Sequence, residues 1–213
     1  MTIAIKILLS LSAIGFWLFT QKLLGKRKAP PHNGIGDAFH SLTASSNRYL
    51  NDSPKAANTL LISSSAVIDA LGVFLIAQTL LGDTIRPLLG LMILFSLRQI
   101  NQAISSLPTP EGMIWRDPGV PSIFVTYGVS NDLFFSGHTA LAVLGALELM
   151  QLGSPLFSFL GAFVIAFQVI TVLLLRAHWT MDVFTGAIAA LWTHQVVLKL
   201  APSVDQWITS ITG

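Results

Sequence analysis

The stretch from Pro155 to Leu175, PLFSFLGAFVIAFQVITVLLL, contains no charged residue and is followed at once by the polar motif RAHWTMDV at 176–183. A helix of this length rises about 30 Å, which matches the hydrocarbon core of a bilayer. The apolar residues form an unbroken run and do not alternate with polar ones, which argues against a membrane strand. The stretch therefore predicts a membrane-spanning helix that ends in a group of chemically active side chains.

The composition extends this prediction to the whole chain. Of the 213 residues, 53% are hydrophobic and 10% are charged, whereas a soluble domain carries roughly 25% charged residues. Lipid must therefore be part of the solvent of this protein. The formal net charge of +2 is too small to indicate nucleic acid as a partner, and the absence of cysteine excludes disulfides and thiolate metal sites.

Six stretches are apolar enough to be read as spans, so we expect an all-α polytopic membrane helix bundle with about six transmembrane spans. No small-x-small cleavage site follows the first stretch, which favours a retained span over a signal peptide. The expected spans are Ile3–Leu24, Ala56–Leu81, Ile85–Ile104, Leu133–Leu152, Pro155–Leu175 and Met181–Leu200.

Two regions are expected: residues 1–54, with the first span and an interfacial helix, and residues 55–213, a five-span catalytic core with motifs at 134–139 and 176–183. Apolar residues recur at helical spacing between Gly34 and Asp52, which is typical of a helix in the membrane interface. A mobile linker is the alternative, because Pro30 and Pro31 precede this segment. The Pro- and Gly-rich connection 105–132 adjoins the first motif, and we expect it to be functional.

The two motifs are predicted to meet on one membrane face. Ser136-Gly137-His138-Thr139 begins the fourth span, and Arg176-Ala177-His178-Trp179-Thr180-Met181-Asp182 joins the fifth span to the sixth. The fifth span returns the chain to the face from which the fourth span starts. The topology alone therefore brings two histidines to the same surface.

His178 and Asp182 are four residues apart, so on a helix they share one face. A carboxylate there can accept a ring N–H of His178 and fix its tautomer, which leaves the other nitrogen for a substrate. His138 is then available as a proton donor or acceptor. The simpler alternatives are a polar histidine at a wet interface, a helix-start hydrogen bond for the His/Asp pair, and an N-cap role for Ser136 or Thr139.

The motifs Phe134-Phe135-Ser136-Gly137-His138-Thr139 and His178-Trp179-Thr180-Met181-Asp182-Val183 resemble the second and third motifs of the type 2 phosphatidic acid phosphatase superfamily. The closest resemblance is to its sphingomyelin synthase and phosphatidylcholine:diacylglycerol cholinephosphotransferase branch. Leu97-Arg98, Leu107 to Gly112 and Leu147 to Met150 extend the likeness, which covers about half of the chain, from Ile85 to Thr193.

The sequence departs from the superfamily pattern in three places. The first motif, a Lys followed by Arg-Pro, is absent, and Arg98 is the one basic residue near that position. Trp179 replaces the usual Tyr, and Val172 stands where the phosphatases carry an Arg. These differences favour the transferase branch over a plain phosphatase.

The resemblance implies a membrane lipid phosphotransferase that moves a phosphocholine-like headgroup from a phospholipid donor to diacylglycerol or a similar lipid alcohol acceptor. In that mechanism His178 attacks phosphorus to give a phosphohistidine, His138 transfers the proton, and Asp182 holds His178. Neither a metal nor a cofactor is implied, and the oligomeric state stays open. The phosphate-binding candidates are Arg98, Arg176, Ser136 and Gly137.

Two other functions remain open from the sequence. In a lipid phosphate phosphatase, water would replace the acceptor alcohol at the same residues. A non-catalytic lipid-binding or transport protein is the second alternative, and Asp69 and Glu148 within the spans are its best support. For both acids we expect hydrogen bonding between helices, and we expect His194 to lie inside the sixth span as a packing or hydrogen-bonding residue.

The charges give a prediction of orientation. Five basic residues follow the first span, against three on the opposite face, so the positive-inside rule favours a cytoplasmic site. Sphingomyelin synthases work on the exoplasmic face, so the resemblance implies the opposite orientation. The two sets are Lys26, Arg27, Lys28, Arg48 and Lys55, against Lys6, Arg86 and Lys199.

Overall fold

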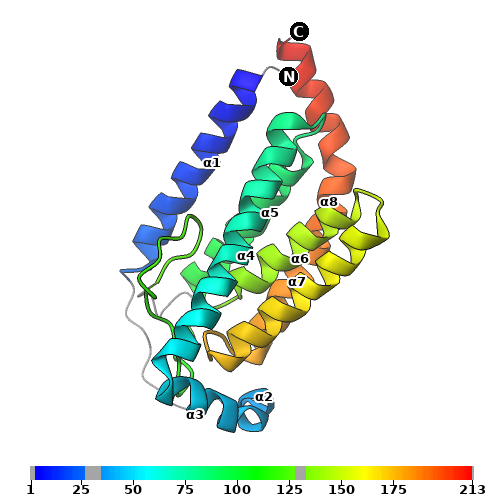
Figure 1. Cartoon of the computed structure of the whole chain (residues 1–213). Coiled ribbons are helices and arrows are strands. Elements are labelled where there is room, and N and C mark those ends of the chain that lie inside the picture. The colour runs from blue at the N-terminus through cyan, green and yellow to red at the C-terminus, as the bar shows by residue number, and fades with distance from the viewer. Residues whose placement is uncertain (1–2, 27–34, 128–132, 213) are drawn as a thin grey trace.

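The computed structural model describes residues 3–26, 35–127 and 133–212, and this part of the chain is all-helical, as expected (Figure 1). The basic residues Arg27 and Lys28, the Pro30-Pro31 pair and the end of the 105–132 connection lie outside the described residues. The helices are α1 (Ile3–Leu24), α2 (Ala38–Leu42), α3 (Ala44–Asp52), α4 (Pro54–Leu81), α5 (Arg86–Ile104), α6 (Gly137–Met150), α7 (Pro155–Leu174) and α8 (Thr180–Thr212).

Four of these helices, α1, α4, α7 and α8, are long and apolar enough to cross a membrane. The protein is therefore an integral multi-pass membrane protein, with four clear spans where about six were expected. The expected fourth span is shorter than predicted, because α6 begins only at Gly137 and has 14 residues, or about 21 Å. The expected third span corresponds to α5, which has 19 residues and carries Arg86 and Arg98.

The short helix α6 lies inside the bundle. It packs against α7, α8 and α4, and most of its side chains are buried. A helix that is apolar on all sides is stable where other helices surround it. Phe135, Val143 and Leu144 form a core cluster here with Leu94 of α5 and Ala190 of α8, so the start of α6 is held firmly between its neighbours.

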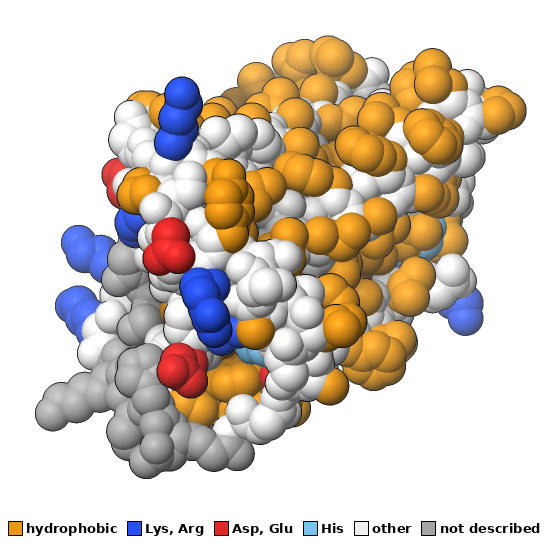
Figure 2. All heavy atoms as spheres, turned by 60° about the horizontal axis from the view of Figure 1, so that its bottom comes forward, with side chains coloured by type: hydrophobic (Ala, Val, Ile, Leu, Met, Phe, Trp, Pro, Cys, Tyr) orange, Lys and Arg blue, Asp and Glu red, His pale blue; other side chains and the backbone are white. Residues whose placement is uncertain are grey.

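The outer surface of the bundle is apolar. Large exposed side chains include Phe16 and Phe19 of α1, Phe159 and Phe163 of α7, and Trp192 of α8. Figure 2 shows hydrophobic side chains over the sides of the bundle, while most of the charged ones gather at the end that carries α2 and α3. An apolar surface of this extent indicates contact with lipid.

The start of α1 and the end of α8 lie at one end of the bundle, and α2 and α3 lie at the other (Figure 1). The segment from Ile35 to Asp52 contains two short helices, Ala38–Leu42 and Ala44–Asp52. Leu42 and Tyr49 are 80% and 62% exposed, which provides apolar contacts suited to a membrane interface.

The two acidic residues in the spans have different partners. Glu148 accepts three hydrogen bonds from Arg86 of α5, at 2.8–3.2 Å, and lies 3.5 Å from Nδ1 of His194. This is the interhelical contact expected from the sequence. Asp69 instead accepts hydrogen bonds from the Ser122 hydroxyl and from the backbone N–H groups of Ile123 and Phe124, so the expectation for Asp69 was wrong.

Candidate active site

The corner between α7 and α8 carries the second motif. Its backbone turns through Arg176, whose φ of 51° is in the left-handed region. Helix α8 begins at Thr180, and the Asp182 carboxylate accepts the backbone N–H of Trp179 at 2.9 Å. An acidic side chain in the first turn of a helix satisfies a free donor and complements the helix dipole. Asp182 is therefore fixed by the start of its own helix.

The contact between His178 and Asp182 is looser than the sequence predicts. Nδ1 of His178 lies 3.8 Å from Oδ2 of Asp182, which is too long for a hydrogen bond. Within the described residues, His178 Nδ1 and Asp182 Oδ1 are both buried without a hydrogen-bond partner. The carboxylate therefore lies close to the ring without a direct hydrogen bond to it.

The first motif is joined directly to the second. The backbone N–H of Ser136 donates to the Asp182 carbonyl at 3.1 Å. At the same point Gly186 of α8 packs so closely that an added Cβ would lie 2.7 Å from the Ser136 carbonyl oxygen. Residues far apart in the sequence are therefore held in fixed register, with His138 on one side of the junction and His178 on the other.

Ser136 has a structural role here. Its side chain is completely buried, and its hydroxyl accepts the Thr139 N–H at 3.3 Å as the N-cap of α6. This confirms the N-cap alternative. Ser136 does not line the cavity described below, so the structure does not support it as a phosphate-binding residue.

Arg98 of α5 lies against the start of α6. Its Nε donates to the Phe135 carbonyl at 2.9 Å, and its side chain is buried. An added Cβ on Gly137 would come within 3.0 Å of the same Nε. The absence of a side chain at Gly137 therefore allows the guanidinium group to lie beside His138.

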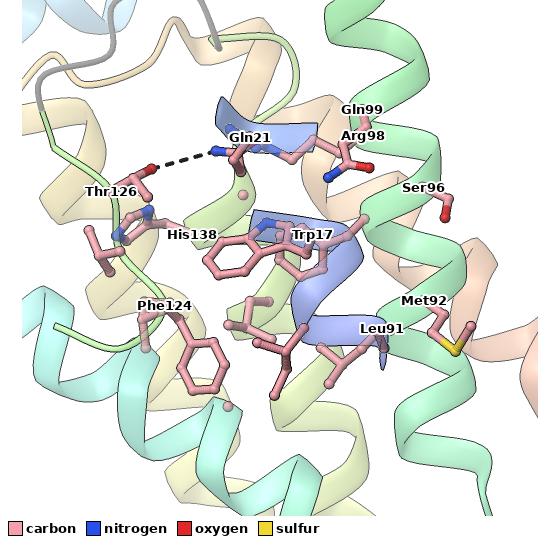
Figure 3. Close-up of a pocket in the computed structure, with 18 of the residues that line it drawn as sticks. Trp17, Gln21, Leu91, Met92, Ser96, Arg98, Gln99, Phe124, Thr126 and His138 are labelled. Carbon is pink, nitrogen blue, oxygen red and sulfur yellow. Dashed lines mark hydrogen bonds between the residues drawn. The ribbon is translucent and has the colours of Figure 1, made fainter. Parts of the chain in front are cut away.

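Arg98, His138 and His178 line a single cavity of about 300 Å³ (Figure 3). The Trp115 and His138 rings pack edge to face, with their centroids 5.1 Å apart. Nε2 of His138 is buried without a hydrogen-bond partner among the described residues. Figure 3 shows His138 and Arg98 towards one end of the cavity, and apolar side chains such as Phe124 and Leu91 farther along. The cavity is therefore amphipathic, with its titratable groups grouped together.

Arg176, a second candidate phosphate ligand, does not line this cavity. Its guanidinium donates to the Glu111 carbonyl at 2.6 Å and to the His40 carbonyl at 3.1 Å. Arg176 therefore links the 105–127 connection to α2 and holds the corner between α7 and α8 from outside. The expectation that it binds phosphate is not supported by this geometry.

Residues of the α2 segment also reach the corner between α7 and α8, which the sequence motifs did not predict. Asp37 accepts the Thr180 N–H and hydroxyl at 2.6 and 2.8 Å, and it also caps α2. His40 Nε2 lies 3.0 Å from the His178 carbonyl, and its ring stacks on Trp179 at 5.2 Å. The sequence marks Asp37 as an N-cap residue. It gives no sign of the second partner, Thr180, which lies 143 residues away.

The contacts of Asp37 affect its pKa. Burial alone would raise the pKa of Asp37, but the hydrogen bonds from Thr180 and from the His40 backbone outweigh burial and lower it. A carboxyl group whose pKa is lower in the folded than in the unfolded protein stabilises the fold at pH values above its pKa in the unfolded protein, near 3.8. This stabilisation is lost as the pH falls through the lowered pKa.

We expect Asp37→Ala to reduce the free energy of unfolding at neutral pH by about 1–2 kcal/mol, because two helix starts lose their acceptor. Thermal unfolding of the detergent-solubilised protein would measure this loss. The difference from wild type should shrink below about pH 4, where the carboxyl group becomes protonated. Asp52→Ala, which removes an exposed carboxylate, is the control, and an equal effect of both variants would contradict the double-cap role.

The fold and the cavity define a multi-pass helical membrane protein with two histidines and an arginine at one amphipathic site. The family model AtPDCT1/2 matches residues 36–199, so the chain belongs to this family. Phosphatidylcholine:diacylglycerol cholinephosphotransferase 1 of Arabidopsis thaliana is 25% identical over 145 residues, which are 68% of this chain and 47% of that protein.

The match thus spans about half the length of that relative. It confirms the cholinephosphotransferase branch of the resemblance found in the sequence. No solved structure matches the chain. The family match begins at residue 36, so α1 lies outside it.

Proposed function

We propose that this protein transfers a phosphocholine-like headgroup from a phospholipid to diacylglycerol or a similar lipid alcohol, through a phosphohistidine on His178. The observation that carries the proposal is the joint placement of Arg98, His138 and His178 in one otherwise largely apolar cavity. The apolar walls suit acyl chains, and the cationic and titratable groups suit a phosphodiester. The named activity of the Arabidopsis relative is of this kind.

In the first half-reaction Nε2 of His178 attacks phosphorus, because Nδ1 faces Asp182. The bond between phosphorus and the diacylglycerol oxygen breaks, and His138 in its protonated form donates a proton to that oxygen. Asp182 stabilises the positive charge on the His178 ring, and Arg98 stabilises the non-bridging phosphoryl oxygens. Diacylglycerol leaves, and the headgroup phosphate stays on His178.

The second half-reaction reverses these roles. The hydroxyl of the incoming lipid alcohol gives its proton to His138, and its oxygen attacks phosphorus. The bond from phosphorus to Nε2 then breaks, which regenerates His178. The same chemistry with water would give a phosphatase, but the apolar walls beside His138 favour an acceptor that enters from the lipid.

The structure removes the main support for a transport function. Asp69 holds the backbone of the 105–127 connection, and Glu148 is paired with Arg86. Both acids therefore have structural partners. We further propose that α5, with 19 residues, and the shorter α6, with 14 residues, complete a bundle of six crossing helices.

The test of this function is an assay with purified protein, phosphatidylcholine labelled in its headgroup, and unlabelled diacylglycerol of different chain length. We expect labelled phosphatidylcholine with the new chains to appear. Release of free phosphocholine with no new phospholipid would instead identify a hydrolase.

The reaction proposed here uses a histidine nucleophile and arginine charge, so transfer should survive EDTA. We expect the transfer rate to stay unchanged. Complete loss under EDTA that Mg²⁺ or Zn²⁺ restores would show that the histidines act as metal ligands.

A further inference from the structure

The part of the cavity wall formed by α1 and α5 carries a second group of polar atoms. Trp17 and Gln21 of α1 line the cavity together with Gln99 of α5. Gln21 and Gln99 are each 8% exposed. Among the described residues, Trp17 Nε1, Gln21 Oε1 and Gln99 Nε2 are buried without a hydrogen-bond partner. Buried polar atoms nearly always have a partner, so three without one on a single cavity wall indicate atoms that a ligand completes.

Gln21 and Gln99 lie at the same end of the cavity as His138 and Arg98, and Trp17 lies between this end and the apolar part (Figure 3). The Gln21 amide donates to the Thr126 hydroxyl at 3.5 Å, and Figure 3 shows this pair at the same end of the cavity as His138. Trp17 lies next along α1, and Leu91 and Met92 of α5 lie beyond it (Figure 3). A lipid with its reacting oxygen near His138 would therefore place its glycerol esters beside Trp17.

The unpartnered atoms differ in what they require. Trp17 Nε1 and Gln99 Nε2 are donors and need acceptors, such as ester carbonyl groups. Gln21 Oε1 is an acceptor and needs an O–H or N–H group. Diacylglycerol supplies both ester carbonyls and a hydroxyl. A phosphatidylcholine donor has ester carbonyls but neither an O–H nor an N–H group, so it leaves Gln21 unsatisfied.

We propose that Trp17, Gln21 and Gln99 form the subsite that binds the acceptor lipid alcohol, with its hydroxyl on Gln21 and its ester carbonyls on Trp17 and Gln99. This inference rests on the proposed transfer function. The acceptor hydroxyl donates to Gln21 when the acceptor binds to the phosphohistidine form, and it turns to His138 before its oxygen attacks phosphorus. Gln99 lies within the family match and α1 lies outside it.

The first test is Gln21→Leu, which removes the acceptor atom and keeps a similar volume. We expect the KM for diacylglycerol to rise roughly three- to tenfold, the effect of one lost hydrogen bond, while the KM for phosphatidylcholine stays unchanged. Gln206→Leu, on the exposed surface of α8, is the matched control. An unchanged KM for diacylglycerol in Gln21→Leu would overturn the subsite.

A competitor sharpens the test. The 3-O-methyl ether of diacylglycerol keeps both esters but has no hydroxyl to donate. Wild type should bind this ether more weakly than diacylglycerol, and Gln21→Leu should bind the two equally. Persistence of the wild-type preference in the variant would contradict the assigned role of Gln21.

Binding can also be followed without turnover. Diacylglycerol brominated near the ester groups should quench tryptophan fluorescence in wild type, and Trp17→Phe should lose that part of the quenching. If wild type transfers no headgroup but Trp17 is still quenched, the proposed function fails and the lipid site stands. If transfer is intact and neither Gln21→Leu nor Trp17→Phe changes acceptor binding, the subsite fails and the function stands.

Discussion

Replacement of His178 by alanine is expected to reduce headgroup transfer by a factor on the order of 10³ or more, because the nucleophile of the proposed mechanism is lost. Label from headgroup-labelled phosphatidylcholine should appear on wild-type protein and be absent from the variant. The label on wild type should be acid-labile, as a phosphorus–nitrogen bond is. An active His178→Ala protein would end the phosphohistidine proposal.

The folded state should survive this change. His40 contacts the backbone carbonyl of His178, which alanine retains, and the helix-start bond from Trp179 to Asp182 does not involve the imidazole. A melting temperature close to that of wild type is therefore expected and serves as the control. The loss of activity can then be assigned to chemistry.

His138→Ala is expected to lower transfer from phosphatidylcholine by roughly 10²- to 10⁴-fold, the range for loss of a general acid. The p-nitrophenyl ester of phosphocholine should still release p-nitrophenolate and label His178, because this leaving group departs without a proton. Stopped-flow absorbance would measure the first turnover. Equal impairment with both donors would show that His138 does not protonate the leaving oxygen.

The contrast between the two variants separates their roles. His178→Ala should fail with either donor, because no bond to phosphorus can form. His138→Ala should fail only where the leaving oxygen needs a proton. The second half-reaction should stay slow in His138→Ala with both donors, since the acceptor hydroxyl still needs a base.

The sequence predicts which residues meet, but it is wrong about how His178 and Asp182 meet. The spacing of four places both on one helix face only if both are helical. Helix α8 begins at Thr180, so His178 precedes the helix, and Asp182 satisfies the Trp179 N–H first. The helix start thus competes with the histidine for the same carboxylate.

Arg98 and Arg176 show the same limit. Both are basic residues near motifs, and the sequence treats them alike. The structure buries Arg98 against Gly137 in the cavity and turns Arg176 towards the backbone of Glu111 and His40. The packing of α5 on α6 sets the environment of Arg98, and the contact of α2 with the corner between α7 and α8 sets that of Arg176. Neither contact is local in the sequence.

The sequence by itself determined the membrane environment, the helical class and the common face of the two motifs, because apolar runs and the order of spans depend on local composition and on chain direction. Only the tertiary structure decided the rest. It assigned Asp69 to the 105–127 connection, made Asp37 a double cap, and gave the cavity a wall from α1. Each of these depends on hydrogen bonds or packing between segments distant in the chain, which are fixed only once the helices are packed together.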